Sequence, residues 1–452
     1  MRAFVMGFIA VGIMVTAAAQ APAPPTPQKV ITLHLSTKGQ TRISPLLYGI
    51  NYDWNAVPGG ETTAFSNAML SVAHTQIVRY PGGWNAEKYN WSNNTEIPWR
   101  HFSPIPGATA DGILQHFPQA SFITPSAVAI QNPAMTNRVA QLSEQLVSKY
   151  GDRVKIWEIG NEWFLQRGAK QHPEILQENL SRYAMLLNTV VPRMKAANPS
   201  IHIYVVAEWN SKKDAERLRQ LTRRDVWAQI DGIAIHPYCG MKDDASSCAL
   251  LQQRVAEIQS ATHKHDIYSS EWAVVRNHTE DDFGIRNANY TLMAIRNLAM
   301  AGVEIGAYWP PVREIPALAF VSKDFNSAYP TGIVFGWMSE AYEGVALRVT
   351  GDADAAAARN NDTITVFVPS GEQGPELVRI DLTGMHLKGS ASGTVLFSEQ
   401  PDNIQTSWKA SQAPLSVKLT TEADGKRYAE FSLDPATPGR GSSYEIARIA
   451  LR

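Results

Sequence analysis

The sequence predicts an α/β fold, a (β/α)8 TIM barrel followed by a C-terminal all-β sandwich domain. Between residues 46 and 310, eight short apolar or aromatic runs alternate with amphipathic stretches, as parallel strands and helices do in a closed barrel. After about Tyr342, short alternating strands are separated by Gly, Pro and polar turns, as in a β-sandwich. A doubly wound open sheet is the rival fold, but no glycine-rich phosphate turn follows the first strand.

The eight predicted strands are rich in β-branched and aromatic residues. They cover residues 46–52, 76–80, 121–129, 154–160, 202–207, 231–236, 266–271 and 304–309. The clearest helical stretches between them cover residues 135–149, 174–197, 214–221, 250–265 and 286–301. A further alternating stretch at 30–35 precedes the barrel, so we expect it to pair into the C-terminal sandwich.

The chain divides into five predicted segments. Residues 1–19 have the features of an export signal, with a basic Arg2, an apolar run and small residues at 17–19. Residues 20–28 contain four prolines and form a flexible leader. Residues 29–40 are the strand that joins the sandwich, 41–341 the barrel and 342–452 the sandwich. The mature protein is therefore expected to be secreted or periplasmic.

The composition limits the classes of partner. The 452 residues include 41 basic and 42 acidic side chains, a formal net charge of -1, whereas nucleic acid or an anionic membrane requires a dense basic face. A neutral ligand fits better, and the 12 Trp and 15 Tyr offer the flat apolar surfaces on which sugar rings stack. The oligomeric state is left open by the sequence.

Polar, charged and aromatic side chains follow the ends of the predicted strands, and in a barrel these ends lie together at one mouth. Carboxylates, amides, an arginine and aromatic rings together suit a polyhydroxylated ring. The candidates are Asp53, Arg79, Trp84, Asn161, Glu162, His236, Tyr238, Glu271 and Trp309.

Glu162 and Glu271 are the best candidate pair of catalytic carboxyls, since they end the fourth and seventh predicted strands. Glycoside cleavage needs two such groups. Asn161 is placed to hydrogen-bond a substrate hydroxyl. Between the two carboxyls, Tyr238 is expected to orient Glu271 and His236 to tune Glu162.

Three further strand residues have two interpretations each. Arg79 either holds substrate or pairs with Glu158 or Glu162 inside the barrel. Glu158 shares strand parity with Glu162 and is expected to be a buried structural carboxylate. Glu208 either binds a substrate hydroxyl or forms a salt bridge.

Two segments resemble the paired motifs of clan A glycoside hydrolases. These are Lys-Ile-Trp-Glu-Ile-Gly-Asn-Glu-Trp at 155–163 and Ser-Ser-Glu-Trp at 269–272. Arg-Tyr-Pro-Gly-Gly at 79–83 and Tyr-Trp-Pro at 308–310 are similar to the second and eighth strands of the family 51 α-L-arabinofuranosidases. The resemblance covers most of the mature chain. It implies that Glu162 is the general acid/base and Glu271 the nucleophile of a retaining hydrolase.

The chain departs from family 51 at two positions that contact the sugar in that family. Asp53 stands where the first-strand motif usually ends in Glu, and Trp84 stands where Asn follows Pro-Gly-Gly. The stretch 79–91 is also similar to clan A endoglucanases and xyloglucanases. We therefore expect an α-L-arabinofuranosidase acting on plant cell-wall polysaccharides or oligosaccharides. An endo-acting β-glucanase or xylanase is the alternative, and a non-catalytic carbohydrate-binding protein is the alternative of another class.

No metal and no cofactor are predicted, because no cluster of His, Cys and carboxylate has metal-ligand spacing. The nucleophile-elbow motif of serine hydrolases is also absent. Cys239 and Cys248 enclose a short polar loop and either form a disulfide or remain two thiols with geometry unsuited to bridging. A general acid that works near neutral pH further predicts a raised pKa for Glu162 in the free protein.

Overall fold

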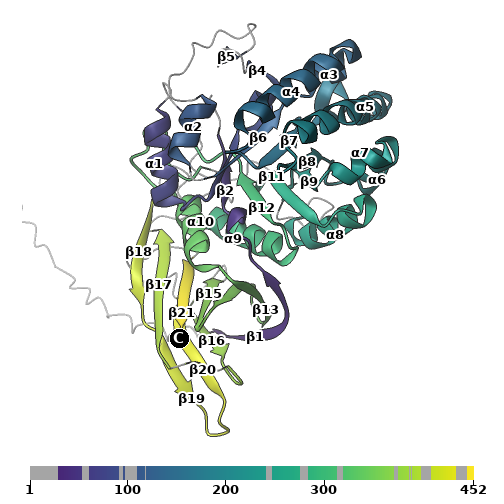
Figure 1. Ribbon diagram of the computed structural model, residues 1–452. Coiled ribbons are helices and arrows are strands. Elements are labelled where there is room, and N and C mark those ends of the chain that lie inside the picture. The colour runs from purple at the N-terminus through teal and green to yellow at the C-terminus, as the bar shows by residue number, and fades with distance from the viewer. Residues whose placement is uncertain are drawn as a thin grey trace, which may run out of the picture.

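The computed structural model combines a barrel with a β-sheet domain packed against one side of it (Figure 1). The structure describes residues 29–52, 57, 61–90, 95–96, 109–117, 119–240, 247–274, 284–312, 319–370, 375–385, 387, 389–398, 409–433 and 445–452. The predicted export signal and leader, Asp53 and most of residues 91–119 lie outside these ranges.

Eight parallel strands form the closed barrel. In spatial order they are β2 (Gly49–Asn51), β3 (Ile77–Tyr80), β6 (Ala120–Thr124), β7 (Ile156–Ile159), β8 (His202–Val206), β9 (Gly232–Ile235), β11 (Asp266–Val274) and β12 (Ile305–Tyr308). The sheet closes because β11 pairs with both β9 and β12, and β12 pairs with β2. The predicted barrel is therefore confirmed.

Helices surround the barrel, as Figure 1 shows. They are α1 (Thr62–Val72), α2 (Ala110–His116), α3 (Ala127–Gln131), α4 (Thr136–Tyr150), α5 (Pro173–Ala197), α6 (Lys212–Leu221), α7 (Arg224–Gln229), α8 (Leu251–Thr262), α9 (Ile285–Met300) and α10 (Pro330–Ala341). In α4, buried Val139, Ala140, Leu146 and Val147 recur at helical spacing and form its inner face. Among the described residues, no helix has both the length and the apolar character needed to cross a membrane.

One predicted strand is wrong at its end. The run predicted at 121–129 stops at Thr124, and the chain turns at Ser126 into α3. The free N–H groups of Ser126 and Ala127 at the start of α3 both donate to the Glu87 carboxylate, each at 2.7 Å. A carboxylate 39 residues away thus takes the place of a local side-chain cap. The local sequence therefore does not signal the start of this helix.

The C-terminal domain is one hydrogen-bonded sheet of ten strands that curls around a core. Its strands are β1 (Lys29–Arg42), β13 (Val345–Gly351), β14 (Ala356–Asn360), β15 (Thr363–Pro369), β16 (Glu376–Asp381), β17 (Ala391–Ser398), β18 (Ala410–Leu415), β19 (Lys418–Thr421), β20 (Arg427–Leu433) and β21 (Glu445–Leu451). Leu33 of β1, Leu415 of β18 and Phe431 of β20 share one hydrophobic core, so the two ends of the sheet curl toward each other.

The first strand lies in the middle of this sheet. β1 pairs in parallel with β16 and antiparallel with β13, so the N-terminal end of the described chain joins the two halves of the C-terminal domain. The outer face of the sheet meets the barrel, because Ala346, Ala356 and Phe367 belong to the same hydrophobic cluster as the barrel core. Three short strands, β4 (Tyr89–Asn90), β5 (Thr95–Glu96) and β10 (Tyr238–Cys239), complete the fold.

Candidate active site

The two candidate carboxyls meet at the mouth of the barrel. Glu162 lies just beyond β7 and Glu271 lies in the second half of β11. One carboxylate oxygen of Glu162, one of Glu271 and a ring nitrogen of His236 lie within 4.8 Å of one another. The closed barrel thus brings together side chains that are 109 residues apart in the sequence.

Glu271 is held by a hydrogen bond on each carboxylate oxygen. The Tyr238 hydroxyl donates to Oε1, and Arg79 Nη1 donates to Oε2 at 3.0 Å. Burial raises the pKa of Glu271, while the charges of His236 and Arg79 act in the opposite direction. Both oxygens are therefore fixed in a site that is almost closed to water.

Arg79 is a fully buried side chain that uses all of its N–H groups inside the barrel. Besides the bond to Glu271, Nε and Nη2 donate to Glu158 at 2.6 and 3.1 Å. Nη1 also donates to Asn51 Oδ1 at 2.8 Å, and Nη2 to Asn161 Oδ1 at 2.9 Å. Because five bonds use the five guanidinium N–H groups, Arg79 holds the site together and pairs with Glu158, while no bond joins it to Glu162.

His236 contacts the other catalytic candidate. Its Nδ1 lies 3.1 Å from Glu162 Oε1, and its Nε2 lies 3.7 Å from Glu158 Oε1. Burial disfavours the imidazolium, but the charge of Glu271 and the interactions with Glu158 and Glu162 outweigh burial and raise the pKa of His236 to about 9.

The expectation of a raised pKa for Glu162 is wrong for the free protein. Burial does act to raise the pKa of Glu162, but the hydrogen bond and the charge of His236 outweigh it, and the pKa is lowered. The proton of the Glu162–His236 pair therefore resides mainly on His236 in the absence of substrate. The sequence could not give this result, since it depends on the 3.1 Å contact between two different strand ends.

The turn that carries Glu162 has a tightly specified backbone. Gly160 has φ 75° and Glu162 has φ 30°, a left-handed conformation that is uncommon for a non-glycine residue and recurs at functional sites. A Cβ on Gly160 would lie 2.2 Å from the Ser126 hydroxyl. Only glycine therefore allows the loop after β7 to approach the loop after β6 this closely.

Glu87 is a residue of the site that the sequence did not reveal. Its carboxylate accepts the backbone N–H groups of Ser126, Ala127 and Asn161, each at 2.7 Å, and the Ser126 hydroxyl at 2.8 Å. Burial raises the pKa of Glu87, and these four donors oppose that shift. Glu87 thus joins the loops after β3, β6 and β7, and it fixes the residue that precedes Glu162.

Two buried donors make no hydrogen bond among the described residues, Asn161 Nδ2 and His236 Nε2. His236 Nε2 lies within ion-pair distance of Glu158. Buried polar atoms rarely remain unpaired, so a ligand or an ordered water is the natural partner of Asn161 Nδ2. For Asn161 this agrees with a role in binding a hydroxyl group.

The tryptophans predicted at the strand ends divide into two groups. Trp163, Trp209 and Trp272 are buried in the barrel core. Trp84 has 41% of its surface exposed, and Trp309 is half-buried beside Gly83, on which a Cβ would lie 3.0 Å from the Trp309 ring. Only the second group presents an aromatic surface that a ligand can reach. Asp53 and Trp54 lie outside the described residues.

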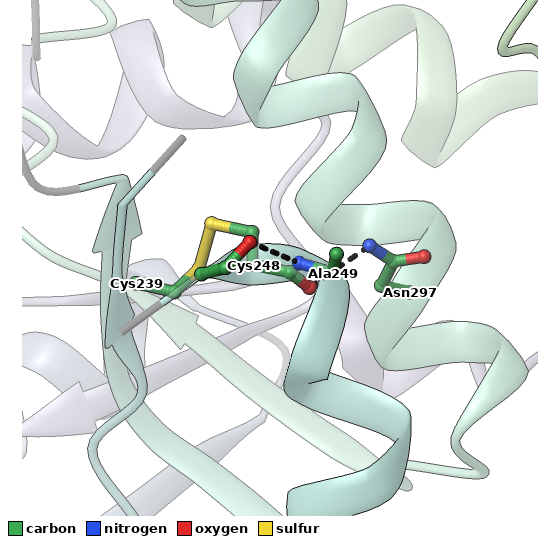
Figure 2. The surroundings of a disulfide bond; sticks show 5 residues. Cys239, Cys248, Ala249 and Asn297 are labelled. Atoms are coloured by element: carbon green, nitrogen blue, oxygen red, sulfur yellow. Dashed lines mark hydrogen bonds between the residues drawn. A yellow bond between two sulfur atoms is a disulfide. The ribbon is translucent and has the colours of Figure 1, made fainter. Parts of the chain in front are cut away.

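A disulfide joins Cys239 and Cys248 next to the site (Figure 2). Cys239 belongs to β10, which pairs in parallel with the end of β11, and Asn297 of α9 donates to the Cys248 carbonyl at 3.1 Å. Tyr238 immediately precedes Cys239. The disulfide therefore anchors the short strand that carries the hydrogen-bond donor to Glu271.

Glu162, His236 and Glu271 also have the donor types of a metal site. Each already has a protein partner, and the Arg79 guanidinium contacts Glu271 at 3.0 Å. A fixed positive charge at this distance disfavours a second cation. Within the described part of the chain, the arrangement suits proton transfer and nucleophilic attack better than metal binding.

Comparison of the sequence with family models and with curated proteins finds no match. Solved structures do match. A family 51 α-L-arabinofuranosidase from Bifidobacterium longum is 15% identical with a TM-score of 0.64, covering 94% of this chain and 100% of that one. The thermostable family 51 α-L-arabinofuranosidase from Thermotoga petrophila is 15% identical with a TM-score of 0.65, covering 93% and 99%. A family 44 xyloglucanase from Paenibacillus polymyxa is 13% identical with a TM-score of 0.59, covering 94% and 100%. The chain therefore has the fold of these glycoside hydrolases along nearly its whole length.

Proposed function

We propose that the protein is a retaining glycoside hydrolase in which Glu271 is the nucleophile and Glu162 the general acid/base. The observation that carries the proposal is the approach of the two carboxylates to within 4.8 Å at the barrel mouth. Retaining enzymes hold their carboxyls about 5 to 5.5 Å apart, whereas inverting enzymes need about 6.5 to 9.5 Å to admit a water molecule.

In the first step, a Glu271 oxygen attacks the anomeric carbon while the bond to the leaving oxygen breaks. That oxygen keeps the electron pair and takes a proton from Glu162. In the second step, Glu162 removes a proton from water, whose oxygen displaces Glu271 and restores the original configuration. Arg79 and Tyr238 hold Glu271 in position for attack.

His236 supplies the protonation state that Glu162 needs. Glu271 loses its negative charge as it bonds to the sugar, and this charge is the largest of those that favour the His236 imidazolium. The pKa of His236 then falls, and its Nδ1 proton can pass to Glu162 Oε1 across the 3.1 Å contact. The proton thus reaches Glu162 in the same step in which the leaving oxygen requires it.

The proposed substrate is a neutral plant cell-wall polysaccharide or its oligosaccharides. An α-L-arabinofuranoside is the first choice, supported by the motifs at 79–83 and 308–310 and by the fold of the family 51 enzymes. The fold of the family 44 xyloglucanase and the exposed Trp84 support endo action on a β-glucan or xylan as the second candidate. Trp84 and Trp309 are the proposed sugar platforms, and Asn161 is the proposed hydroxyl ligand.

We also propose that the protein acts outside the cytoplasm, in the periplasm or secreted. The disulfide between Cys239 and Cys248 supports this location, because structural disulfides persist mainly in oxidising compartments.

Hydrolysis of a panel of aryl glycosides and polysaccharides tests the function. Wild type is compared with Glu162→Gln and Glu271→Gln, and the anomer of the first product is followed by NMR. Turnover with retention, lost by at least about 1,000-fold in Glu271→Gln, is the expected result. Absence of turnover on every substrate, with sugar still bound, would instead favour a non-catalytic carbohydrate-binding protein.

A further inference from the structure

Glu208 is a third carboxylate at the barrel mouth that the proposed mechanism does not use. β7 and β8 pair with Ile159 opposite Val205, and β8 and β9 pair with Val206 opposite Ala234. Continued beyond the strand ends, these registers bring Glu208 level with Glu162 on one side and with His236 on the other.

Glu208 follows two residues after the end of β8, whose inner face points into the barrel. Tyr204 of β8 has its ring 5.6 Å from the ring of Tyr268. The Tyr268 hydroxyl in turn lies 2.6 Å from the Ser121 hydroxyl of β6, on the far side of the barrel. Glu208 comes four residues after Tyr204, beyond the end of β8, and the charges of both Glu162 and His236 act on its carboxylate, which places it at the barrel mouth.

No salt bridge joins Glu208 to a basic side chain among the described residues, although the charge of His236 acts on it. Its side chain is held by Asn210, whose backbone N–H donates to Oε1 at 3.2 Å. Burial raises the pKa of Glu208, with a smaller contribution from the charge of Glu162, while Asn210 and the charge of His236 oppose the shift. A carboxylate accepts up to about four hydrogen bonds, so a half-buried one beside a site for polyhydroxylated ligands can accept a further bond from a hydroxyl donor.

We propose that Glu208 forms the subsite for the leaving group, where it accepts a hydrogen bond from a hydroxyl of the sugar attached to the scissile oxygen. The inference rests on the proposed hydrolase function. The general acid always stands on the leaving-group side of the scissile bond, and β8, which leads to Glu208, neighbours β7, which leads to Glu162.

The charge of Glu208 also sets the class of sugar that this subsite accepts. A neutral sugar offers hydroxyl donors to this carboxylate, and a hydrogen bond to a charged acceptor is a strong one. A uronic acid in the same place would bring a third negative charge next to Glu162 and Glu208. The subsite is therefore specific for neutral sugars and rejects acidic ones.

The experiment compares two substrates that share the cleaved sugar. One is its 4-nitrophenyl glycoside, which places no sugar in the leaving-group subsite, and the other is an oligosaccharide with a neutral sugar there. In Glu208→Gln, kcat/KM for the oligosaccharide is expected to fall about 10- to 100-fold, while kcat/KM for the aryl glycoside stays within about twofold. In the same variant, the ratio of kcat/KM for a neutral leaving-group sugar to kcat/KM for a uronic acid leaving group is expected to fall.

Glu304→Gln is the matched control, because Glu304 is an exposed carboxylate at the opposite end of the barrel, just before β12. It should leave both substrates unchanged. Equal losses of kcat/KM on the two substrates in Glu208→Gln, or no loss on either, would overturn the subsite. Absence of turnover by the wild type on every glycoside would overturn the hydrolase function itself, and the subsite with it.

Discussion

At the scale of single residues, Tyr238 is the side chain that orients the nucleophile most directly. Its hydroxyl donates to Glu271 Oε1, and the bond holds one oxygen for attack. Tyr238→Phe is expected to lower kcat by about 10- to 100-fold, with a much smaller change in KM, because the lost bond acts on the reacting group. Steady-state kinetics on an aryl glycoside measures both constants.

Tyr204→Phe provides the control for this variant. Tyr204 lies in β8 and contacts Tyr268 edge-on, so its substitution also removes a buried phenol hydroxyl from the barrel. Its kcat should stay within about twofold of wild type. An equal loss of kcat in the two variants would show that removing any buried tyrosine hydroxyl from the barrel lowers kcat. Tyr238 would then have no particular role toward Glu271.

His236 makes the stability of the protein depend on pH. Its pKa is raised from 6.5 to about 9, so the folded state binds a proton that the unfolded state releases between these values. The resulting stabilisation is complete below about pH 6.5 and is lost as pH rises through about 9. The free energy of unfolding should therefore fall by up to about 3 kcal/mol over this window, relative to His236→Asn.

Urea unfolding at pH 6.5 and pH 9.5 measures this difference. The His236→Asn variant lacks the titrating group, so it reports the contribution of all other residues. If both proteins lose the same free energy between the two pH values, His236 is not charged in the folded state.

At the scale of secondary structure elements, Glu87 ties three loops together. Glu87→Gln would place an amide NH2 against N–H donors of Ser126, Ala127 and Asn161, leaving at least one of them unpaired. Stability is expected to fall by about 1–3 kcal/mol, and kcat/KM by at least about tenfold because Asn161 and Glu162 shift together.

Thermal unfolding and steady-state kinetics of Glu87→Gln test this expectation, and Glu144→Gln on the outer face of α4, where the carboxylate is 46% exposed, is the control. A stable variant with the kcat/KM of wild type would exclude a positioning role for Glu87.

The disulfide is expected to stabilise both the fold and the site. Cys239 and Cys248 are separated by nine residues, and a loop of this length contributes about 2–3 kcal/mol in the chain-entropy description. The free energy of unfolding of the double variant Cys239→Ser/Cys248→Ser, measured in urea, should be lower than that of wild type by this amount. It should also lose part of its kcat, because β10 and Tyr238 are then held less firmly. Unchanged stability and kcat would show that β10 is fixed by its pairing with β11 alone.

The sequence predicts those residues of the site that lie at the ends of strands. Glu162, Glu271, His236 and Tyr238 each follow or end a strongly patterned run, and closure of the barrel then brings them together. Glu87 gave no such signal, because its partners lie 39 to 74 residues away. The pKa direction of Glu162 likewise depends on a contact between two elements.

The same distinction holds for the elements. Helices α4, α5 and α9 have long amphipathic patterns, and their predicted bounds lie within one residue of the observed ones. The short helices α2, α3 and α7 span 7, 5 and 6 residues, too few for the helical period to appear clearly. α10 is buried on most sides, so it has no polar face to reveal its period.

At the scale of the whole molecule, β1 makes the C-terminal domain dependent on the N-terminal end of the described chain. Deletion of residues 29–42 would remove the strand between β13 and β16 and expose two strand edges together with the apolar core. We expect the shortened protein to be insoluble or to lose its cooperative unfolding transition. A soluble deletion variant with unchanged circular dichroism and thermal unfolding would contradict this dependence.

The most direct test of the central claim is the configuration of the glycosyl azide formed by Glu162→Ala and by Glu271→Ala in the presence of azide. With Glu162→Ala, azide should replace water in the second step and give a product with the configuration of the substrate. With Glu271→Ala, azide should enter the space of the missing nucleophile and give the inverted product. The two variants are therefore expected to give opposite configurations. Wild-type hydrolysis in both variants, or azide products of the same configuration from both, would show that these two carboxylates are not the acid/base and the nucleophile.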